Sequence, residues 1–456
     1  MYDVMIIGGG SGGYAAAIRA AQLGANVILA ECGETGGTCV NRGCIPSKVW
    51  LKAGDLYSQM KKADAFGINF SSEEIDLNTL KERKSGVSAE IQMGMEALMQ
   101  NNGVEFIKGR AVIKSPREVD VDGQTIETKK IIVATGSSLE APDIPGLDKA
   151  GMTTDDVLEM TEVPESILVC GFGYIEVEMA FLLNTFGCSV TMVGNAARIL
   201  PGEDSETSQR IAQALREKGV QIIPKASVES VKTTKKGSVC VLSGAKEESV
   251  TVKKVLVSKR IPNTKDLGLE ELGVKLNDDN GIQVNDRLES SVEGIFAIGD
   301  VTGGSMLSHT ASSMAVFAAE NAMGQDNCYP FHLIPRCLWT QPEMGSVGLS
   351  EDEAEEKGYD VETGAFPYAV NGLAMVRNQV DGAVKVVFDT KYGEILGVHI
   401  VGSNATEVIG EAVMAMQLEC TVQELARSIR VHPTFSEAVV DAARDAGGWA
   451  LFLPKG

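Results

Sequence analysis

The chain has 456 residues, of which 44% are hydrophobic, and it carries a formal net charge of −21. This length exceeds one ordinary hydrophobic core and predicts two to four domains. The acidic balance argues against nucleic acid as a partner, and no apolar run is long enough to span a membrane.

The N-terminal residues predict a strand–turn–helix–strand unit that binds a dinucleotide. An apolar strand is expected over Tyr2–Ile7, an Ala-rich helix over Tyr14–Leu23 and a second strand over Asn26–Ala30. The turn before the helix has the pattern G-x-G-x-x-G, formed by Gly8, Gly10 and Gly13. Such glycines let the backbone approach a pyrophosphate, and Glu31 can accept a hydrogen bond from a ribose hydroxyl. The alternative is an ordinary glycine-rich turn.

Two cysteines, Cys39 and Cys44, follow this unit closely and have Gly43 between them. Their spacing suits a disulfide that opens and closes, and Arg42 and Lys48 are candidate cations for lowering the thiol pKa. The alternative is a pair of buried structural thiols. Nine scattered cysteines and no export signal predict a reducing compartment, the cytoplasm, where a disulfide is expected to be catalytic. No spacing resembles a zinc site, so we expect no metal.

The dinucleotide predicted at the N-terminal turn would lie against these cysteines. A nicotinamide cannot hold electrons beside a disulfide while it waits for a second partner, whereas a flavin can, so we expect FAD. A helix over Val49–Lys62 would place Cys44 near its N-terminus, where the helix dipole favours a thiolate.

Two later strands end in residues suited to contact this cofactor. A polar linker and a long helix are expected within Ser71–Gln100, and short strands over Val104–Val121. Ile131–Ser137 is expected as a buried strand that ends in small residues, which let the backbone approach a cofactor. Gly294–Asp300 is expected as a strand that ends on an acid, and Asp300 can hold a ribityl hydroxyl. Ordinary strand ends are the alternative.

The middle of the chain repeats the N-terminal unit. A strand over Ile167–Cys170 leads into a turn that keeps its first two glycines, Gly171 and Gly173. The helix that follows is expected to end at Phe186, before another strand over Ser189–Val193. The sequence therefore predicts a second dinucleotide-binding domain.

Two positions of this repeat differ from the first unit. Glu176 stands where the first unit has Gly13, and Gly194 stands where it has Glu31. A carboxylate at the first position adds bulk and charge near the pyrophosphate, and Gly194 cannot bond a ribose, a loss of about 1–3 kcal/mol. The missing acid makes NADP less disfavoured than usual. Candidate phosphate contacts, with a solvated surface charge as the alternative for the arginine, are Asn195, Arg198 and Lys259.

The C-terminal part predicts an α+β domain with no nucleotide motif. Strands are expected over Trp339–Leu349, Gly382–Asp389 and Glu394–Val401, and helices over Thr406–Leu418 and Thr421–Ser428. Near the end, His432 and Glu437 are spaced to form a proton-transfer pair, which suits a dithiol substrate that needs a base. The alternative is a structural histidine before Pro433.

Taken together, the motifs resemble those of the FAD-dependent pyridine nucleotide–disulfide oxidoreductases over essentially the whole chain. Gly36–Lys48 is similar to the redox-disulfide motif, most closely to that of the branch that oxidises dihydrolipoamide. Ala134–Gly136 and Gly299–Asp300 match the two remaining FAD motifs. His432–Thr434, together with Glu437, matches the C-terminal acid–base motif.

The resemblance implies an α/β fold with two Rossmann-like dinucleotide-binding domains and a C-terminal α+β dimerisation domain. The expected divisions are an FAD-binding domain at 1–145, an NAD(P)-binding-type domain at 146–265, the second part of the FAD-binding domain at 266–332, and an interface domain at 333–456. A homodimer is implied, because in this family the motif of His432 and Glu437 reaches the disulfide of the other subunit.

The resemblance also implies roles for individual residues. Cys44 forms the charge-transfer contact with the flavin, Cys39 exchanges with the substrate, and Lys48 pairs with Glu178 beside the flavin. The implied FAD contacts are Gly8, Gly10, Gly13, Glu31, Gly37, Thr38, Lys48, Ala111, Thr135, Gly136, Ser137, Asp300 and Met306. The implied nicotinamide-nucleotide positions are Gly171, Gly173, Glu176, Gly194 and Lys259.

The activity that the resemblance implies is oxidation of protein-bound dihydrolipoamide through the disulfide and FAD, with NAD or NADP as acceptor. The implied partner is a lipoylated carrier protein of a 2-oxoacid dehydrogenase or glycine-cleavage complex. Glu176, Gly194 and Lys259 depart from the family pattern, and all three lie on the nicotinamide site. Two alternatives follow: a flavin–disulfide oxidoreductase with impaired nicotinamide binding that serves another protein carrier, and a non-catalytic complex subunit.

Overall fold

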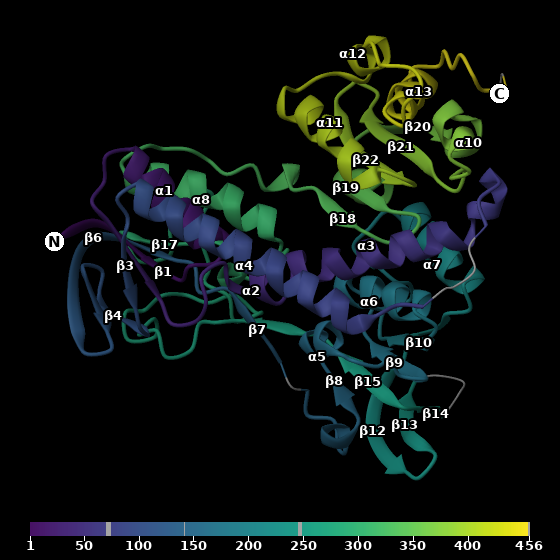
Figure 1. The fold of residues 1–456 in the computed structure, drawn as a ribbon. Helices are drawn as coiled ribbons and strands as arrows, with labels where there is room; N and C mark the ends of the chain where they lie inside the picture. Colours follow the sequence, from purple (N-terminus) through teal and green to yellow (C-terminus); the bar gives the residue numbers. More distant parts are fainter. Residues whose placement is uncertain (70–73, 141, 245–248, 455–456) are drawn as a thin grey trace.

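The protein was analysed as a computed structural model, which describes residues 1–69, 74–140, 142–244 and 249–454. Figure 1 shows an N-terminal body joined by green segments from the second half of the chain, a teal body built on the middle of the chain, and a yellow-green C-terminal body. Across these ranges, no helix has both the length and the apolar sequence needed to cross a bilayer. The same ranges contain no group of three or more His, Cys, Asp or Glu side chains placed to hold a metal ion.

The N-terminal body is built on a seven-stranded sheet with the order β3-β2-β1-β6-β5-β4, to which β17 adds beside β6. Its strands are β1 (Tyr2–Ile7), β2 (Val27–Glu31), β3 (Glu105–Lys108), β4 (Ala111–Ser115), β5 (Glu118–Val121), β6 (Gln124–Val133) and β17 (Ile295–Ala297). Strands β1, β2, β3, β6 and β17 are parallel where they pair. Because a parallel sheet is covered on both faces, β1 is a continuous apolar run that is buried from Val4 to Ile7.

Helices cover this sheet and carry the cysteines. Helices α1 (Ser11–Gln22) and α8 (Ser308–Ala322) lie side by side in Figure 1. Buried alanines of both helices belong to one hydrophobic cluster. The cysteine stretch forms α2 (Gly37–Asn41) and α3 (Cys44–Lys61), so the helix predicted from Val49 begins earlier, at Cys44 itself. The long predicted helix is α4 (Leu77–Asn101), whose N-cap Asp76 accepts two backbone N–H bonds. Positions 71–73 of the predicted linker lie outside the described residues.

The middle body repeats this design with a five-stranded sheet of order β11-β10-β9-β15-β8. Its strands are β8 (Gly151–Met152), β9 (Ser166–Cys170), β10 (Ser189–Gly194), β11 (Gln221–Pro224) and β15 (Lys254–Val257), and its helices are α5 (Thr154–Glu159), α6 (Tyr174–Thr185) and α7 (Ser205–Glu217). An antiparallel sheet flanks it, with β12 (Ser227–Thr234), β13 (Gly237–Ser243) and β14 (Ser249–Val252). The two bodies are connected by the antiparallel pair β7 (Ser137–Leu139) and β16 (Arg260–Pro262).

The C-terminal body is a five-stranded antiparallel sheet of order β18-β19-β22-β21-β20, with helices packed on it. Its strands are β18 (Arg336–Leu338), β19 (Met344–Gly348), β20 (Val361–Pro367), β21 (Ala383–Asp389) and β22 (Ile395–Val401). Its helices are α9 (Glu351–Glu356), α10 (Gly372–Val376), α11 (Ala405–Gln417), α12 (Val422–Arg427) and α13 (Glu437–Ala446).

Two of the predicted strands are shorter in the structure than the sequence-based expectation. The strand predicted over Trp339–Leu349 is broken, and 339–343 lie between β18 and β19, where Pro342 cannot donate a ladder hydrogen bond. The strand predicted over Gly294–Asp300 is limited to β17, and Asp300 lies in the 3-10 turn Gly299–Thr302 that follows.

Candidate active site

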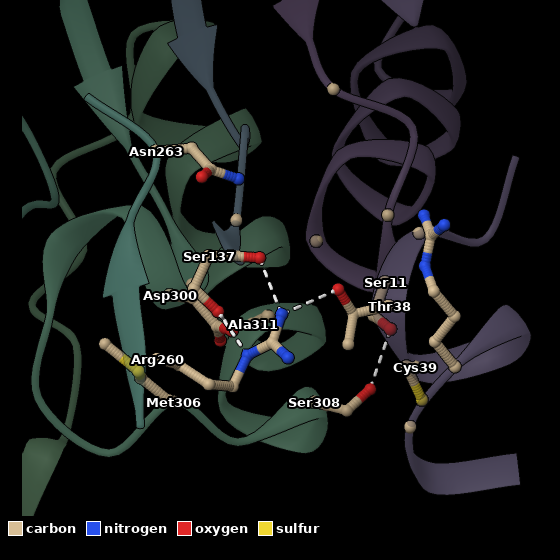
Figure 2. Close-up of a pocket in the computed structure, with 18 of the residues that line it drawn as sticks. Ser11, Thr38, Cys39, Ser137, Arg260, Asn263, Asp300, Met306, Ser308 and Ala311 are labelled. Carbon is tan, nitrogen blue, oxygen red and sulfur yellow. Dashed lines mark hydrogen bonds between the residues drawn. The ribbon is translucent and has the colours of Figure 1, made fainter. Parts of the chain in front are cut away.

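A cavity of about 930 Å³ lies where the strands of the first sheet end. It is lined by the glycine-rich turn before α1, by α2 and α3, and by residues of β7, β16 and α8 (Figure 2). The predicted site residues that it brings together are Gly8, Gly10, Glu31, Gly37, Thr38, Cys39, Cys44, Lys48, Ala111, Thr135, Gly136, Ser137, Glu178, Asp300 and Met306. Residues from positions 8 to 306 of the chain therefore meet in one cavity.

One end of the cavity has the features of a dinucleotide turn. The Glu31 carboxylate, at the end of β2, accepts a hydrogen bond from the Gly9 N–H at 2.6 Å and another from Gly33. Gly10 is the N-cap of α1, and a Cβ added there would meet no atom closer than 3.9 Å. A Cβ on Gly13 would lie 1.7 Å from the Gly8 carbonyl oxygen, so this position requires glycine. The helix N-terminus is therefore open to a phosphate group.

Arg260, which is not among the predicted site residues, connects three parts of the cavity wall through hydrogen bonds. Arg260 donates from Nε to Ser137 Oγ at 2.8 Å, and from Nη2 to the Ser137 carbonyl at 2.6 Å and to Thr38 Oγ1 at 3.1 Å (Figure 2). Ser137 Oγ in turn donates to Asp300 at 2.5 Å. The sequence offered one clue to Arg260. It directly follows Lys259, which departs from the family pattern, and it precedes Pro262.

The two cysteines are in contact as thiols. Cys39 lies in α2 and Cys44 begins α3. The Cys44 thiol donates to the Cys39 sulfur, which lowers the pKa of Cys39 to about 6, and Ser308, Ser11 and Lys48 also lower it against the effect of burial. The same hydrogen bond, together with burial, raises the pKa of Cys44, although Cys44 begins α3. The thiolate expected on Cys44 from the helix dipole is therefore on Cys39 instead, because the contact between the two thiols outweighs the dipole. The reduced pair therefore holds one proton and one negative charge near neutral pH.

An ion pair between half-buried Lys48 and buried Glu178 lies beside the cysteines. Lys48 stands one helical turn after Cys44 in α3, and its Nζ lies 2.9 Å from the Glu178 carboxylate of α6. The Glu178 side chain is 8% exposed and also accepts the Trp339 backbone N–H at 3.1 Å. Lys48 Nζ lies 4.1 Å from the centroid of the Trp339 ring. Trp339 is not among the predicted site residues, because a strand was predicted there, whereas it lies between β18 and β19.

The predicted acid–base pair forms outside this cavity. His432 Nδ1 lies 2.9 Å from Glu437 Oε1, and Glu437 Oε2 accepts the Thr434 N–H at 2.7 Å. The His432 side chain is 77% exposed, and neither member of the pair belongs to the cavity lining. The pair lies at the beginning of α13, on the C-terminal body (Figure 1).

The second glycine-rich turn lies beside the cavity, which is lined by Tyr174 and Ile175 at the start of α6 but not by Gly171, Gly173 or Glu176. The residues of this turn do not fit a dinucleotide as those of the first turn do. The Glu176 carboxylate folds back over Gly171 and Gly173 and accepts a hydrogen bond from Ser258. Two of the three candidate phosphate contacts, Lys259 and Arg198, have other partners. Lys259 pairs with Glu140 at 2.6 Å, and Arg198 donates to the Glu203 carbonyl at 2.9 Å.

Comparisons with known proteins agree with this architecture. The pyridine nucleotide-disulphide oxidoreductase model matches residues 2–315, and the dimerisation-domain model of the same family matches residues 334–443. A dihydrolipoyl dehydrogenase of Bacillus subtilis is 38% identical and covers 99% of each chain. A leghemoglobin reductase of Glycine max is 36% identical over 97% of this chain and 87% of its own.

Solved structures of similar fold agree with these sequence matches. LpdA from Mycobacterium tuberculosis matches with a TM-score of 0.89 at 26% identity, covering 97% of this chain and 99% of its own. The HOCl-induced flavoprotein disulfide reductase RclA from Escherichia coli matches with a TM-score of 0.85 at 27% identity and the same coverage. These matches confirm the expected fold of two Rossmann-like domains followed by a dimerisation domain. The chain belongs to the pyridine nucleotide-disulphide oxidoreductase family.

Proposed function

We propose that the protein is a dihydrolipoamide dehydrogenase. It oxidises dihydrolipoamide carried on another protein, passes the electrons through the Cys39–Cys44 disulfide to FAD, and releases them to NAD or NADP. The observation that carries the proposal is the cysteine pair, which lies in the same cavity as an open dinucleotide turn and beside the Lys48–Glu178 ion pair. Full-length relatives that are named dihydrolipoyl dehydrogenases support the substrate class.

The cavity fits FAD at three separate points. Gly10 and the α1 N-terminus leave space for the pyrophosphate, Glu31 stands beside the turn as a ribose acceptor, and Asp300 lines the cavity as an acceptor for a ribityl hydroxyl. We assign the remaining contacts to Gly8, Gly13, Gly37, Thr38, Ala111, Thr135, Gly136, Ser137 and Met306. Bound FAD supplies a two-electron acceptor next to the cysteine pair.

The disulfide exchange takes place between the substrate dithiol and the Cys39–Cys44 disulfide. One thiolate of dihydrolipoamide attacks the Cys39 sulfur, a mixed disulfide forms, and the Cys39–Cys44 bond breaks with Cys44 leaving as a thiolate. The second substrate thiol, as a thiolate, then attacks the substrate sulfur that is bonded to Cys39. This attack closes the lipoamide ring and releases Cys39 as a thiolate. Two electrons have passed to the protein. Of the two protons that leave the substrate thiols, one ends on Cys44, so that the reduced pair holds one proton and one negative charge, and the other passes to a base. Lys48, held by Glu178, stabilises the negative charge on the pair.

We assign the proton transfers to His432, oriented by Glu437. Because His432 is exposed and lies outside the cavity of its own chain, a second copy of the chain is the source of the base. The match to a family dimerisation domain supports a homodimer. The proposed partner is a lipoylated carrier of a 2-oxoacid dehydrogenase or glycine-cleavage complex, and the proposed location is the cytoplasm. We also propose that the chain divides into four domain segments, with boundaries at residues 145, 265 and 332.

Anaerobic titration of the FAD-loaded protein with dihydrolipoamide tests this function. We expect one equivalent of the dithiol to reduce the wild-type protein. The resulting change in the flavin absorbance should be complete by the time each addition has mixed. A Cys44→Ser variant should bind FAD and lose this reaction. Turnover of dihydrolipoamide by the Cys44→Ser variant at the wild-type rate would contradict the proposal.

A further inference from the structure

The two strand–turn–helix units of this chain form an internal comparison. They have the same register, so that Gly8, Gly10 and Gly13 correspond to Gly171, Gly173 and Glu176. In both units the glycine before the helix is its N-cap. Differences between the two turns can therefore be assigned to particular side chains.

The space above the N-cap glycine is open in the first unit and filled in the second. A Cβ added to Gly10 would meet no atom closer than 3.9 Å, whereas a Cβ on Gly173 would lie 2.6 Å from Glu176 Oε2. A Cβ on Gly171 would lie 2.9 Å from Glu176 Cγ. The Glu176 side chain therefore covers the turn at the place where a dinucleotide pyrophosphate would approach it.

A hydrogen bond fixes this arrangement. Ser258, which follows β15 and is 3% exposed, donates from its hydroxyl to Glu176 Oε1. The carboxylate is thus held over the turn by a buried partner and does not extend into solvent. A pyrophosphate that enters this site meets both the bulk and the negative charge of the carboxylate.

The ribose end of the second unit is closed as well. In the first unit, Gly9 is next to the turn glycine, and its N–H donates to Glu31. In the second unit the corresponding residues are Phe172, which is 5% exposed, and Gly194. A Cβ on Gly194 would lie 2.6 Å from the Phe172 ring, so the ring occupies the space from which an acid at 194 would extend.

We propose that Glu176 and Phe172 are specificity-determining residues that lower the affinity of the second domain for nicotinamide nucleotides. Glu176 competes with the pyrophosphate and must be displaced before a nucleotide binds. Phe172 fills the space that a ribose acceptor at position 194 would need, so that NAD loses the preference that such an acid gives it over NADP. The proposal rests on the proposed function, because it concerns the acceptor side of the same electron path.

Calorimetric binding of NAD⁺ and NADP⁺ to the oxidised, FAD-loaded protein tests this inference without turnover. Glu176→Gly is expected to lower the Kd of both nucleotides about tenfold, equivalent to ~1.4 kcal/mol. Glu176→Gln removes the charge and keeps the bulk, so its Kd should lie between those of wild type and Glu176→Gly. Glu206→Gln, which removes a carboxylate from the first turn of the neighbouring helix α7, is the matched control and should leave the Kd unchanged.

A Kd of Glu176→Gly within twofold of wild type would overturn the inference, and so would an equal gain in Glu206→Gln, which would indicate a general charge effect. The double variant Phe172→Gly/Gly194→Glu should bind NAD⁺ more tightly than NADP⁺, and no change in this ratio would refute the role of Phe172. Flavin absorbance and the unfolding temperature verify that each variant is folded. Dihydrolipoamide reduction of the wild-type flavin involves no nucleotide, so its failure would count against the proposed function alone.

Discussion

At the scale of single residues, the cysteine pair shows how neighbouring groups lower the pKa of one of two similar thiols and raise that of the other. Cys39 receives the hydrogen bond from Cys44 and has Ser11, Ser308 and Lys48 around it, which together outweigh the effect of burial on its pKa. Cys44 keeps the proton. The thiolate is therefore on the residue that we assign to exchange with the substrate.

Alkylation of the anaerobically reduced protein by iodoacetamide tests this assignment. Because the thiolate is the reactive form, the rate at Cys39 should rise as pH increases through about 6. Cys44→Ala removes the largest cause of the lowered pKa, so the midpoint of the rate profile should move upward toward the value of an ordinary thiol. Peptide mapping measures the rate at Cys39 in both proteins. An unchanged midpoint in Cys44→Ala would show that the hydrogen bond is not responsible.

At the scale of elements, the first glycine-rich turn is built around a contact that permits no side chain. A Cβ on Gly13 would lie 1.7 Å from the Gly8 carbonyl, and that carbonyl belongs to the backbone between β1 and α1. Helix α1 could accept a side chain there only by moving away from the strand. The corresponding position in the middle body carries Glu176, so close packing of helix and strand is required in the first unit and is relaxed in the second.

Gly13→Ala is therefore expected to reduce stability by about 1–3 kcal/mol and to lower the amount of FAD that stays bound after gel filtration. Gly94→Ala is the matched control, because Gly94 lies inside helix α4 and a Cβ there meets no atom within 4 Å. That change should raise stability by about 0.5–1 kcal/mol. Chemical denaturation and the flavin absorbance of the purified proteins measure both effects. Equal stabilities for the two variants would show that the Gly8–Gly13 contact does not limit the fold.

At the scale of the whole molecule, the proposed acid–base pair lies outside the cavity that the cysteines of its own chain line. The cysteines line the cavity, whereas His432 and Glu437 form their pair on the C-terminal body. Exposed apolar side chains lie close to this pair in the sequence, including Ile429 at 95% and Val431 at 76% exposure. Their burial against a second copy would accompany delivery of His432 to that copy's cysteines.

A heterodimer of Cys44→Ser and His432→Gln subunits tests this arrangement. If the base acts on the other subunit, one of its two sites contains an intact disulfide together with an intact histidine, and the other contains neither. The isolated heterodimer should then regain about half of the wild-type activity, as expected for one working site in a closed dimer. The activity of the His432→Gln homodimer should fall by about 10²–10⁴-fold, and the Cys44→Ser homodimer, which cannot form the disulfide, should be inactive. A heterodimer as inactive as its parents would show that His432 acts within its own chain.

The sequence by itself determined the elements and the chemistry that depend on local pattern. It predicted the glycine-rich turns, the helix beside Cys44 and the His432–Glu437 pair. Each of these features depends on residues that are close together in the sequence. Only the tertiary structure decided which distant side chains meet. Arg260 on Ser137, Trp339 beside Lys48, and the carboxylate of Glu176 lying over its own turn under Ser258 each depend on how separate strands and helices pack, and no local pattern encodes that packing.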